Sequence, residues 1–595
     1  MLDMFLGAAL LMNVAALTNF LTDVLPPRPY DPPGIFDRPL KRYYDYIIVG
    51  AGSAGAVVAS RLSEEPVSVL LLEAGASELD TEFTIVPGHY GRLFGTDADW
   101  QIKTVPQRYS HFARIDKVSS FPRGKLLGGS SSLNGMVFVR GSRHDFDEWE
   151  SQGCTGWSYK DVLPFFKKME KMKIPQLENS KYHGRKGPIT ITHKRASILE
   201  FFHQQAAGEI GFQTTDCNGC NQIGFCPVQH TIDNGERCSS ASCYLRPVIR
   251  RSNLQVSINS HVSKILFRNK TAIGVEIIKF GRRTKIYARR EVILSAGTFG
   301  SPHILLLSRI GPRDHLQHLK IPVRANLPVG ENYQDQNSLI LTYSINTTLT
   351  SNSNKDDIED KLEYILHRRG RYSSTIDGHV FSKIPIKGPT KAYPDIQIEF
   401  LRSPADIGGN QGALINEIRR ELEPRKPEYG FSIILFSLHP ESTGFLKLRS
   451  RNPMVPPMIN PNTFSKPDDV PKLISGIRLV RSFEKTKAWK SLDARFIRMG
   501  TTNHCDKLPF NTDAHWDCII RHFADSGWHQ TSTCRMGAKS DPTTVVDPYL
   551  RVKGIRNLRV VDASVMRNLP SGNTHAPTVM IAEKAADLIK RARKC

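Results

Sequence analysis

The chain has 595 residues, of which 40% are hydrophobic and 23% are charged. This length and composition allow a large core and more than one structural lobe, and they exclude a disordered or fibrous chain. The formal net charge is +22, but no run of five basic residues, zinc-finger spacing or RNA-binding aromatic motif accompanies it. We therefore interpret the charge as a solvated basic surface and expect no nucleic-acid partner.

A mostly apolar stretch, residues 4–22, lies near the start of the chain and is followed by three prolines. Its length suits a secretory signal peptide or a marginal membrane anchor, although the residues before it carry an Asp and no Lys or Arg. We predict a signal peptide over residues 1–25, with an uncleaved anchor or a plain N-terminal helix as alternatives. A secreted, extracellular protein without stable membrane insertion is expected, because no later apolar stretch could span a bilayer.

A strand, a glycine-rich turn and a helix are predicted next. Residues 45–50, Asp-Tyr-Ile-Ile-Val-Gly, are typical of a buried strand, and a small-residue helix follows the turn. Gly50 allows the tight turn, Gly52 lets the backbone approach a pyrophosphate, and Gly55 lets the helix pack close to the sheet. The helix N-terminus then presents free N–H groups to phosphate, and Ser53 in the same turn is a predicted cofactor contact.

A second strand is predicted over residues 67–72, and it ends at Glu73, 23 residues after Gly50. A carboxylate at this place can accept both ribose hydroxyls of an adenosine and would repel a 2′-phosphate. Strand, glycine fingerprint, helix, second strand and terminal Glu in this register predict a Rossmann-type dinucleotide site. The pattern alone does not separate NAD from FAD.

Residues 121–141 read Phe-Pro-Arg-Gly-Lys-Leu-Leu-Gly-Gly-Ser-Ser-Ser-Leu-Asn-Gly-Met-Val-Phe-Val-Arg-Gly. This segment resembles the first signature of the glucose–methanol–choline (GMC) oxidoreductase family, whose loop runs along the flavin. The resemblance implies that FAD is lined by Arg123, Gly128, Gly129, Ser130 and Asn134. Some members link FAD covalently through a histidine that would fall at Leu133, so the resemblance implies non-covalent FAD here.

Residues 295–312 resemble the second signature of the family, with Arg309 where the pattern has glycine. If that position has a positive φ, an arginine costs about 1–2 kcal/mol of strain. The resemblance extends from about residue 43 to 590. It implies that the backbone of Val262 contacts the adenine and that residues 444–450 form a strand of the substrate-domain sheet, while Gln336 replaces an expected histidine.

Five cysteines cluster between residues 217 and 243, beginning with Cys217-x2-Cys220. Zinc binding is one interpretation of this spacing, but no histidine pair stands at ligand spacing. In an exported chain a disulfide-tied loop is the alternative, and it is the one we favour. We therefore predict no metal site.

The last part of the chain resembles the catalytic region of the family. Residues 528–537, Trp-His-Gln-Thr-Ser-Thr-Cys-Arg-Met-Gly, carry the residue that matches the catalytic histidine, His529. Imidazole suits a base that takes the hydroxyl proton while hydride leaves the alcohol carbon for flavin N5. A strand ending at Asp562 follows, and then a helix that opens near His575, the family's second catalytic position. Further predicted cofactor contacts in this region are Asp562, Ala563 and Thr574.

The dipole of that last helix would stabilise negative charge on the flavin pyrimidine ring and disfavour a charged His575. Pro577 suits its first turn. One residue, Arg567, departs from the family by standing where proline is usual, and the sequence gives no account of its effect.

The predicted fold is therefore α/β, with a Rossmann-type FAD-binding domain and a substrate-binding domain built on an antiparallel sheet backed by helices. The FAD-binding domain is assigned to residues 43–330, with an interleaved substrate-domain segment at 150–235, and to residues 536–595. The substrate-binding domain is assigned to residues 331–535. We expect an FAD-dependent oxidation of a small-molecule alcohol to an aldehyde or ketone.

The identity of the substrate stays open at this point. The resemblance to the insect-type group of the family implies an ecdysteroid or a sugar such as glucose, and we favour a hydrophobic or steroidal alcohol. Oxygen and another electron acceptor are both compatible with the sequence. The alternatives are an FAD-containing lyase and a non-catalytic flavin-binding protein. A nicotinamide dehydrogenase is disfavoured because it would not explain residues 121–141 or 528–577.

Overall fold

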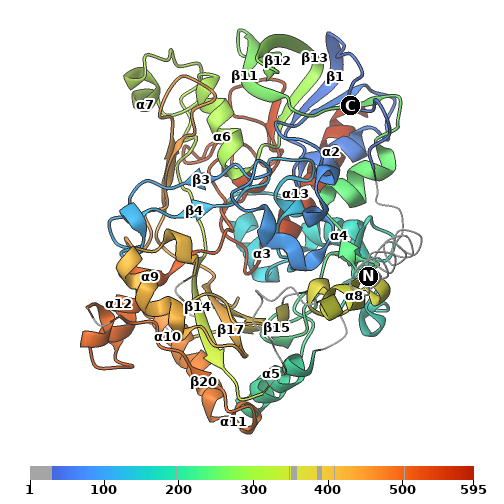
Figure 1. The fold of residues 1–595 in the computed structure, drawn as a ribbon. Coiled ribbons are helices and arrows are strands. Elements are labelled where there is room, and N and C mark those ends of the chain that lie inside the picture. Colours follow the sequence, from blue (N-terminus) through green and yellow to red (C-terminus); the bar gives the residue numbers. More distant parts are fainter. Residues whose placement is uncertain are drawn as a thin grey trace, which may run out of the picture.

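The computed structural model describes residues 30–193, 197–347, 349, 358–374, 376–384, 392–407, 409–501 and 503–594. The predicted signal peptide, residues 1–25, lies outside the described residues. Two seven-stranded sheets organise the molecule, one in the upper and one in the lower half of Figure 1. Among the described helices, none has both the length and the apolar character needed to cross a membrane.

The upper sheet is mixed. Its strands follow the order β10 (Leu254–Ser257), β2 (Val69–Leu72), β1 (Tyr43–Val49), β13 (Arg282–Leu294), β12 (Thr271–Lys279) and β11 (His261–Arg268), and β22 (Leu558–Val560) also pairs with β13. The pairs among β10, β2, β1, β13 and β22 are parallel, whereas β12 pairs antiparallel with β13 and with β11. The apolar runs of β1 and β2 suit a parallel sheet that is buried on both faces. Both predicted strands are present, and β22 ends two residues before Asp562.

Three helices from distant parts of the chain pack together beside this sheet. The first, α2 (Gly55–Leu62), follows the glycine turn, and α4 (Tyr159–Met169) and the C-terminal helix α13 (His575–Lys594) join it. Figure 1 shows α13 in the middle of the molecule, close to α2 and α4. Because α13 begins at His575, the predicted first-turn place of Pro577 is correct.

The lower sheet is antiparallel throughout, as predicted. Its order is β20 (Arg495–Phe496), β14 (Asn337–Ser344), β17 (Gly430–Ser437), β16 (Ile396–Leu401), β15 (Ile376–Ser382) and β7 (Gly224–Cys226), and β21 (Asp525–Ser526) also pairs with β14. Helices α10 (Asp469–Ser482), α12 (Asp513–Phe523) and α5 (Ile198–Glu209) cover its outer side.

Side chains alternate between the two faces of this sheet, as the two-residue period of a strand requires. Ile396, Ile398 and Phe400 of β16 lie in the hydrophobic core beneath the helices. The intervening residues Glu399 and Leu401 face the other way, towards the upper half of the molecule. One face of the sheet is therefore core and the other is the wall of a cavity.

Residues 444–450 do not form a strand of the lower sheet, which corrects the prediction. The strand found there, β18 (Phe445–Lys447), pairs only with β19 (Met458–Asn460) in a two-stranded sheet. The backbone N–H of Leu446 donates to the carbonyl oxygen of Gly330 at 2.6 Å. Its backbone is thus committed to the 330–333 loop, and its side chain lies in the core of the upper half.

The predicted interleaved segment, residues 150–235, contacts both halves. Helix α4 packs on α13 in the upper half, whereas α5 packs on β15 in the lower half. The division of the chain into domains stays a prediction.

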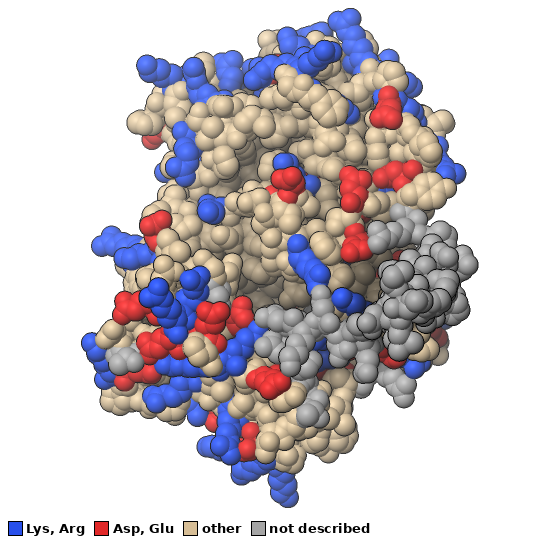
Figure 2. Space-filling model, in the orientation of Figure 1, with Lys and Arg blue, Asp and Glu red and all other residues tan. Residues whose placement is uncertain are grey.

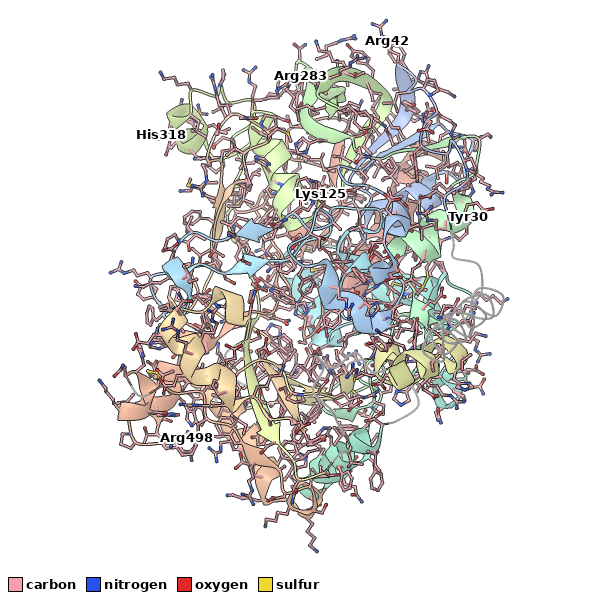
Figure 3. The ribbon with its side chains drawn as sticks, in the orientation of Figure 1. Tyr30, Arg42, Lys125, Arg283, His318 and Arg498 are labelled. Atoms are coloured by element: carbon pink, nitrogen blue, oxygen red, sulfur yellow. A yellow bond between two sulfur atoms is a disulfide. The ribbon has the colours of Figure 1, made fainter. Side chains whose placement is uncertain are left out.

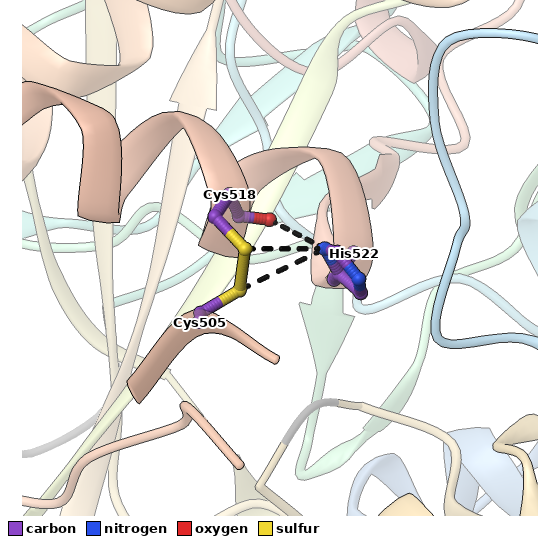
Figure 4. A group of neighbouring side chains, drawn as sticks. All are labelled: Cys505, Cys518 and His522. Atoms are coloured by element: carbon purple, nitrogen blue, oxygen red, sulfur yellow. Dashed lines mark hydrogen bonds between the residues drawn. A yellow bond between two sulfur atoms is a disulfide. The ribbon is translucent and has the colours of Figure 1, made fainter. Parts of the chain in front are cut away.

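The cysteine cluster contains two disulfides, Cys217–Cys226 and Cys238–Cys243, in line with the favoured interpretation. A third, Cys505–Cys518, was not predicted. His522 Nδ1 lies 3.7 Å from Cys505 Sγ and 3.6 Å from Cys518 Sγ, as Figure 4 shows. Because the two sulfur atoms are bonded to each other, this group offers no thiolate ligands for a metal ion.

Lys and Arg side chains gather along the upper edge of the molecule in Figure 2. Arg42 and Arg283 mark this edge in Figure 3. The exposed cations of β13 are Arg282, Arg283, Lys285, Arg289 and Arg290. One exposed strand therefore contributes five of the cations on this edge.

Candidate active site

A cavity of about 410 Å³ lies between the two sheets. The surface in Figure 2 is recessed between the upper and lower halves. The upper half contributes the glycine turn after β1, the end of β2 and the start of β11 to its walls. The lower half contributes β15, β16 and β17.

All but two of the predicted site residues line this one cavity. They are Gly50, Gly52, Ser53, Glu73, Arg123, Gly129, Ser130, Asn134, Val262, His529, Asp562, Ala563, Thr574 and His575. Residues as far apart in sequence as Gly50 and His575 thus meet, as the resemblance implied.

The two exceptions, Gly55 and Gly128, lie behind the cavity wall. A Cβ on Gly55 would collide with the carbonyl oxygen of Gly50, so only glycine lets α2 pack against the turn. Gly128 has φ +83°, and its N–H donates to the carbonyl oxygen of Ala51 at 2.8 Å. Both residues shape the cradle without facing a ligand.

Glu73 ends β2 at one end of the cavity and is buried. Its Oε2 accepts a hydrogen bond from the N–H of Ala51 at 2.9 Å, and its Oε1 accepts one from Gly75 at 3.0 Å. Burial raises the pKa of Glu73 to about 7, against the opposing effect of these backbone donors. Each oxygen keeps a lone pair for a further donor, such as a ribose hydroxyl.

His575 begins α13 at another part of the wall. Its buried Nε2 has no hydrogen-bond partner among the described residues. Burial, with a smaller contribution from Arg237, lowers the pKa of His575 to about 4, so the ring is neutral at pH 7. An unpartnered nitrogen at a helix N-terminus fits a polar ligand atom. Glycine walls, buried Glu73 and this nitrogen are together compatible with bound FAD.

The ring of His529 is oriented by Gln336 of the lower half. Gln336 Nε2 donates to the carbonyl oxygens of Pro570 and Gly572, both at 3.0 Å. The amide therefore presents Oε1, which is only an acceptor, to His529 Nδ1 at 2.7 Å. This network assigns the ring proton to Nδ1 and leaves Nε2 unprotonated.

Asn573 lies opposite the unprotonated nitrogen. Its Nδ2 donates to His529 Nε2 at 3.2 Å and to Glu399 Oε1 at 3.3 Å. Phe436 stacks on the imidazole with 5.6 Å between ring centroids. Burial first, and Arg123 second, lower the pKa of His529 to about 3. His529 is thus a neutral acceptor at the cavity.

The sequence analysis paired His529 with His575, but the described residues show no hydrogen bond between the two rings. Asn573, two residues before His575, contacts Nε2 instead. The sequence analysis did not single out Asn573 or Glu399, and it noted Gln336 only as a departure. For Asn573, the sequence feature that could have identified it is its amide side chain in the segment Ser-Gly-Asn-Thr-His. No sequence feature identifies Glu399.

The other departures from the family pattern lie outside the cavity. Arg309 does have a positive φ, +75°, and its Nε donates to the carbonyl oxygen of Pro322 at 2.8 Å. Arg567 forms an ion pair with Asp541 at 2.8 Å. Leu133, in contrast, is buried and lines the cavity at the place of the linking histidine.

The side of the cavity nearest to the lower sheet is largely apolar. Its lining residues are Tyr90, Phe94, Ile376, Leu401, Ile434, Phe436 and Trp528, together with Glu399. Three of them, Ile376, Glu399 and Leu401, come from strands β15 and β16 of the lower sheet.

Comparison with known proteins matches residues 44–338 and 440–582 to the N- and C-terminal models of the GMC oxidoreductase family. The chain is 39% identical to glucose dehydrogenase [FAD, quinone] of Drosophila melanogaster, over 92% of this chain and 87% of the relative. It is 38% identical to ecdysone oxidase of Bombyx mori, over 92% and 82%.

A third relative, mitochondrial choline dehydrogenase of Mus musculus, is 38% identical over 92% of this chain and 90% of the relative. Among solved structures, formate oxidase of Aspergillus oryzae superposes with a TM-score of 0.82 at 25% identity, covering 93% of this chain and 99% of the other. Pyridoxine 4-oxidase of Mesorbium loti gives a TM-score of 0.78 at 25% identity, covering 92% and 99%.

Proposed function

The chain belongs to the GMC oxidoreductase family, and from that premise we propose how its residues oxidise an alcohol and what kind of alcohol they accept. It is an FAD-dependent oxidoreductase that acts on alcohol groups. When bound, FAD supplies the two-electron acceptor for the hydride that leaves the alcohol carbon. The remaining chemistry is the task of the protein's own side chains.

We assign the binding of FAD to residues of the upper half and to residues at the N-terminus of α13. Glu73 accepts from the ribose hydroxyls, the glycines of the turn after β1 admit the pyrophosphate, and Val262 borders the adenine. Asn134, Asp562, Ala563, Thr574 and His575 are the proposed contacts further along the cofactor. The buried, unpartnered Nε2 of His575 supports the last of these assignments.

His529 is the proposed catalytic base. Its Nε2 accepts the proton of the substrate hydroxyl, while Gln336 keeps the ring proton on Nδ1 and stabilises the imidazolium that forms. Asn573 donates to the substrate oxygen from the opposite side. The observation that carries this proposal is the fixed amide of Gln336, because it leaves His529 no other neutral tautomer.

The apolar and aromatic wall of the lower half favours a largely hydrophobic alcohol as the substrate. The relatives named above act, by their names, on glucose, ecdysone and choline, so the family itself does not decide among them. A steroidal alcohol agrees best with the wall.

FAD is proposed to be held without a covalent bond, because Leu133 offers no nucleophile and no cysteine is among the described lining residues. Acid precipitation should release all the yellow colour into the supernatant; flavin that stays with the protein pellet would contradict this. Secretion after loss of residues 1–25 is likewise a proposal, and N-terminal sequencing of protein from the culture medium tests it.

A substrate screen tests the proposed function. Purified holoenzyme is assayed with sterols, long-chain alcohols, glucose and choline, in air and under nitrogen with an artificial electron acceptor. We expect kcat/KM to be highest for the apolar alcohols. A clear preference for glucose or choline over every apolar alcohol would refute the assignment of the apolar wall.

A further inference from the structure

One carboxyl group stands in the apolar wall of the cavity. Glu399 lies on β16 and is only 3% exposed. Its cross-strand neighbours are His379 on β15 and Ile434 on β17. Ile398 and Phe400, the residues on either side of Glu399, point into the hydrophobic core. Because successive side chains of a strand point to opposite faces, Glu399 points towards the cavity.

The two oxygens of this carboxyl have different surroundings. Oε1 accepts hydrogen bonds from Gln397 Nε2 at 2.9 Å and from Asn573 Nδ2 at 3.3 Å. Oε2 makes no hydrogen bond to any described residue, although Glu399 lines the cavity. Because Oε1 already has two donors, Oε2 is the oxygen that is left to bind a polar group of a ligand in the cavity.

No Lys or Arg of the described residues forms an ion pair with Glu399. The ring of His379 lies beside it, with Nδ1 3.8 Å from Oε1, and burial lowers the pKa of this histidine to about 3, so the ring is neutral. Tyr90 lines the same part of the cavity, and burial and the nearby Glu399 carboxyl both raise the pKa of its hydroxyl. His529 is also neutral at pH 7. The carboxyl therefore has no counter-charge.

We propose that Glu399 binds a second hydroxyl group of the substrate through Oε2, so that the preferred substrate is a largely apolar alcohol that carries a second hydroxyl near the reacting one. This inference rests on the proposed function, because it names the group that accompanies the reacting hydroxyl. Burial raises the pKa of Glu399 to about 7, so both the acid and the carboxylate are present near neutral pH. A hydroxyl satisfies both states, since it accepts from the acid and donates to the carboxylate.

An ammonium group is the competing ligand for an unpaired carboxyl. It would suit the carboxylate but not the acid, whose proton lies on Oε2 because Oε1 already accepts two hydrogen bonds. The hydroxyl is therefore the better match to the geometry.

The position of the second hydroxyl follows from Asn573. One amide nitrogen, Nδ2, donates both to His529 Nε2 and to Glu399 Oε1. The imidazole of His529 and the carboxyl of Glu399 are thus separated by the side-chain amide of Asn573 alone. A hydroxyl bound at Glu399 lies a few bonds from the carbon that is oxidised at His529.

The test uses three ligands of the same length: 1,4-butanediol, 1-pentanol and 4-amino-1-butanol. Equilibrium binding to oxidised holoenzyme is measured by perturbation of the flavin visible spectrum, and flavin reduction is measured without oxygen. The variants are Glu399→Leu and Glu399→Gln, with Glu178→Gln as a matched control on the surface. Flavin content and Tm confirm that each variant is folded and loaded.

We expect wild type and Glu178→Gln to bind the diol at least tenfold more tightly than 1-pentanol. Glu399→Leu should abolish this preference, and Glu399→Gln should keep most of it, because the amide still donates and accepts. Equal binding of diol and 1-pentanol by wild type would overturn the inference. So would a preference for 4-amino-1-butanol that both Glu399 variants lose. Intact binding preferences without flavin reduction by any alcohol would instead refute the proposed function.

Discussion

Two buried carboxyl groups face the same cavity from opposite halves of the molecule, and they are held in different ways. Burial raises the pKa of both Glu73 and Glu399 to about 7. Glu73 is held by backbone N–H groups of two tight turns, those of Ala51 and Gly75. Glu399 is held by the side chains of Gln397 and Asn573, the second of which is 174 residues away in sequence.

The difference separates what each half does. A carboxyl fixed by the backbone belongs to a rigid cradle that is shared by dinucleotide-binding proteins, whereas one fixed by side chains can change from one relative to the next. We therefore expect substitutions in the upper half to affect retention of FAD. Substitutions in the lower half and its network should affect the rate or the choice of substrate while FAD stays bound.

The largest effect is expected for His529→Ala. Loss of the base should slow flavin reduction by about 10²–10⁴-fold while FAD is retained, because the ring faces the substrate side. The measurement is the single-turnover reduction rate without oxygen. His318→Ala, an exposed histidine labelled in Figure 3, is the control and should match wild type. Loss of FAD from His529→Ala would contradict the claim that the two halves have separate roles in FAD binding and in substrate turnover.

Next in size is Glu73→Gln. It should weaken FAD binding by roughly 1–3 kcal/mol, because charge-assisted hydrogen bonds to the ribose are lost. Titration of apoprotein with FAD gives the dissociation constant. The variant saturated with FAD should reduce its flavin at the wild-type rate. An unchanged dissociation constant would remove the ribose role from Glu73.

A smaller effect is expected for the residue that fixes the tautomer. Gln336→Leu removes the acceptor at His529 Nδ1 and the donor to Pro570 and Gly572, so flavin reduction should slow by about tenfold, or roughly 1.4 kcal/mol. Gln336→Glu keeps an acceptor and should recover part of the rate at a pH where it is ionised. Equal rates for the Leu variant and wild type would show that Gln336 does not orient the base.

The smallest effect is expected from pH. His529 has a lowered pKa of about 3, so it is protonated only when the pH falls towards that value. As pH falls from 8 to 5, kcat/KM for a simple alcohol should change by less than about twofold on account of this group. A simple alcohol is used because it does not depend on Glu399. A loss of activity with a midpoint near the ordinary histidine pKa of about 6.5 would contradict the neutral, buried base.

The sequence predicted the upper half well because its signals are local. Strand, glycine turn, helix and Glu73 lie within one βαβ unit, and Gly55 is needed because the carbonyl oxygen of Gly50, five residues earlier, lies against it. The antiparallel sheet and the convergence of residues from 50 to 575 followed from the family resemblance. The start of α13 was close to its predicted place.

The lower half was harder to predict because its contacts are long-range. Gln336, Glu399 and Asn573 come together only when β14, β16 and the segment before α13 have assembled. The spacing of these residues in the sequence does not indicate that they are close in space. Glu399 occupies an alternating strand position whose register is visible only in the sheet. The third disulfide and the two-stranded pairing of β18 were also missed, although each joins residues that are close in sequence.

The central claim is that this cavity removes hydride from an alcohol carbon after His529 has taken up the hydroxyl proton. Stopped-flow reduction of the holoenzyme without oxygen tests it most directly, with an alcohol and the same alcohol deuterated at the reacting carbon. We predict that the flavin absorbance bleaches, that one carbonyl product forms per flavin and that deuterium slows the bleaching. Flavin that stays oxidised with every alcohol tested, while FAD remains bound, would contradict the claim.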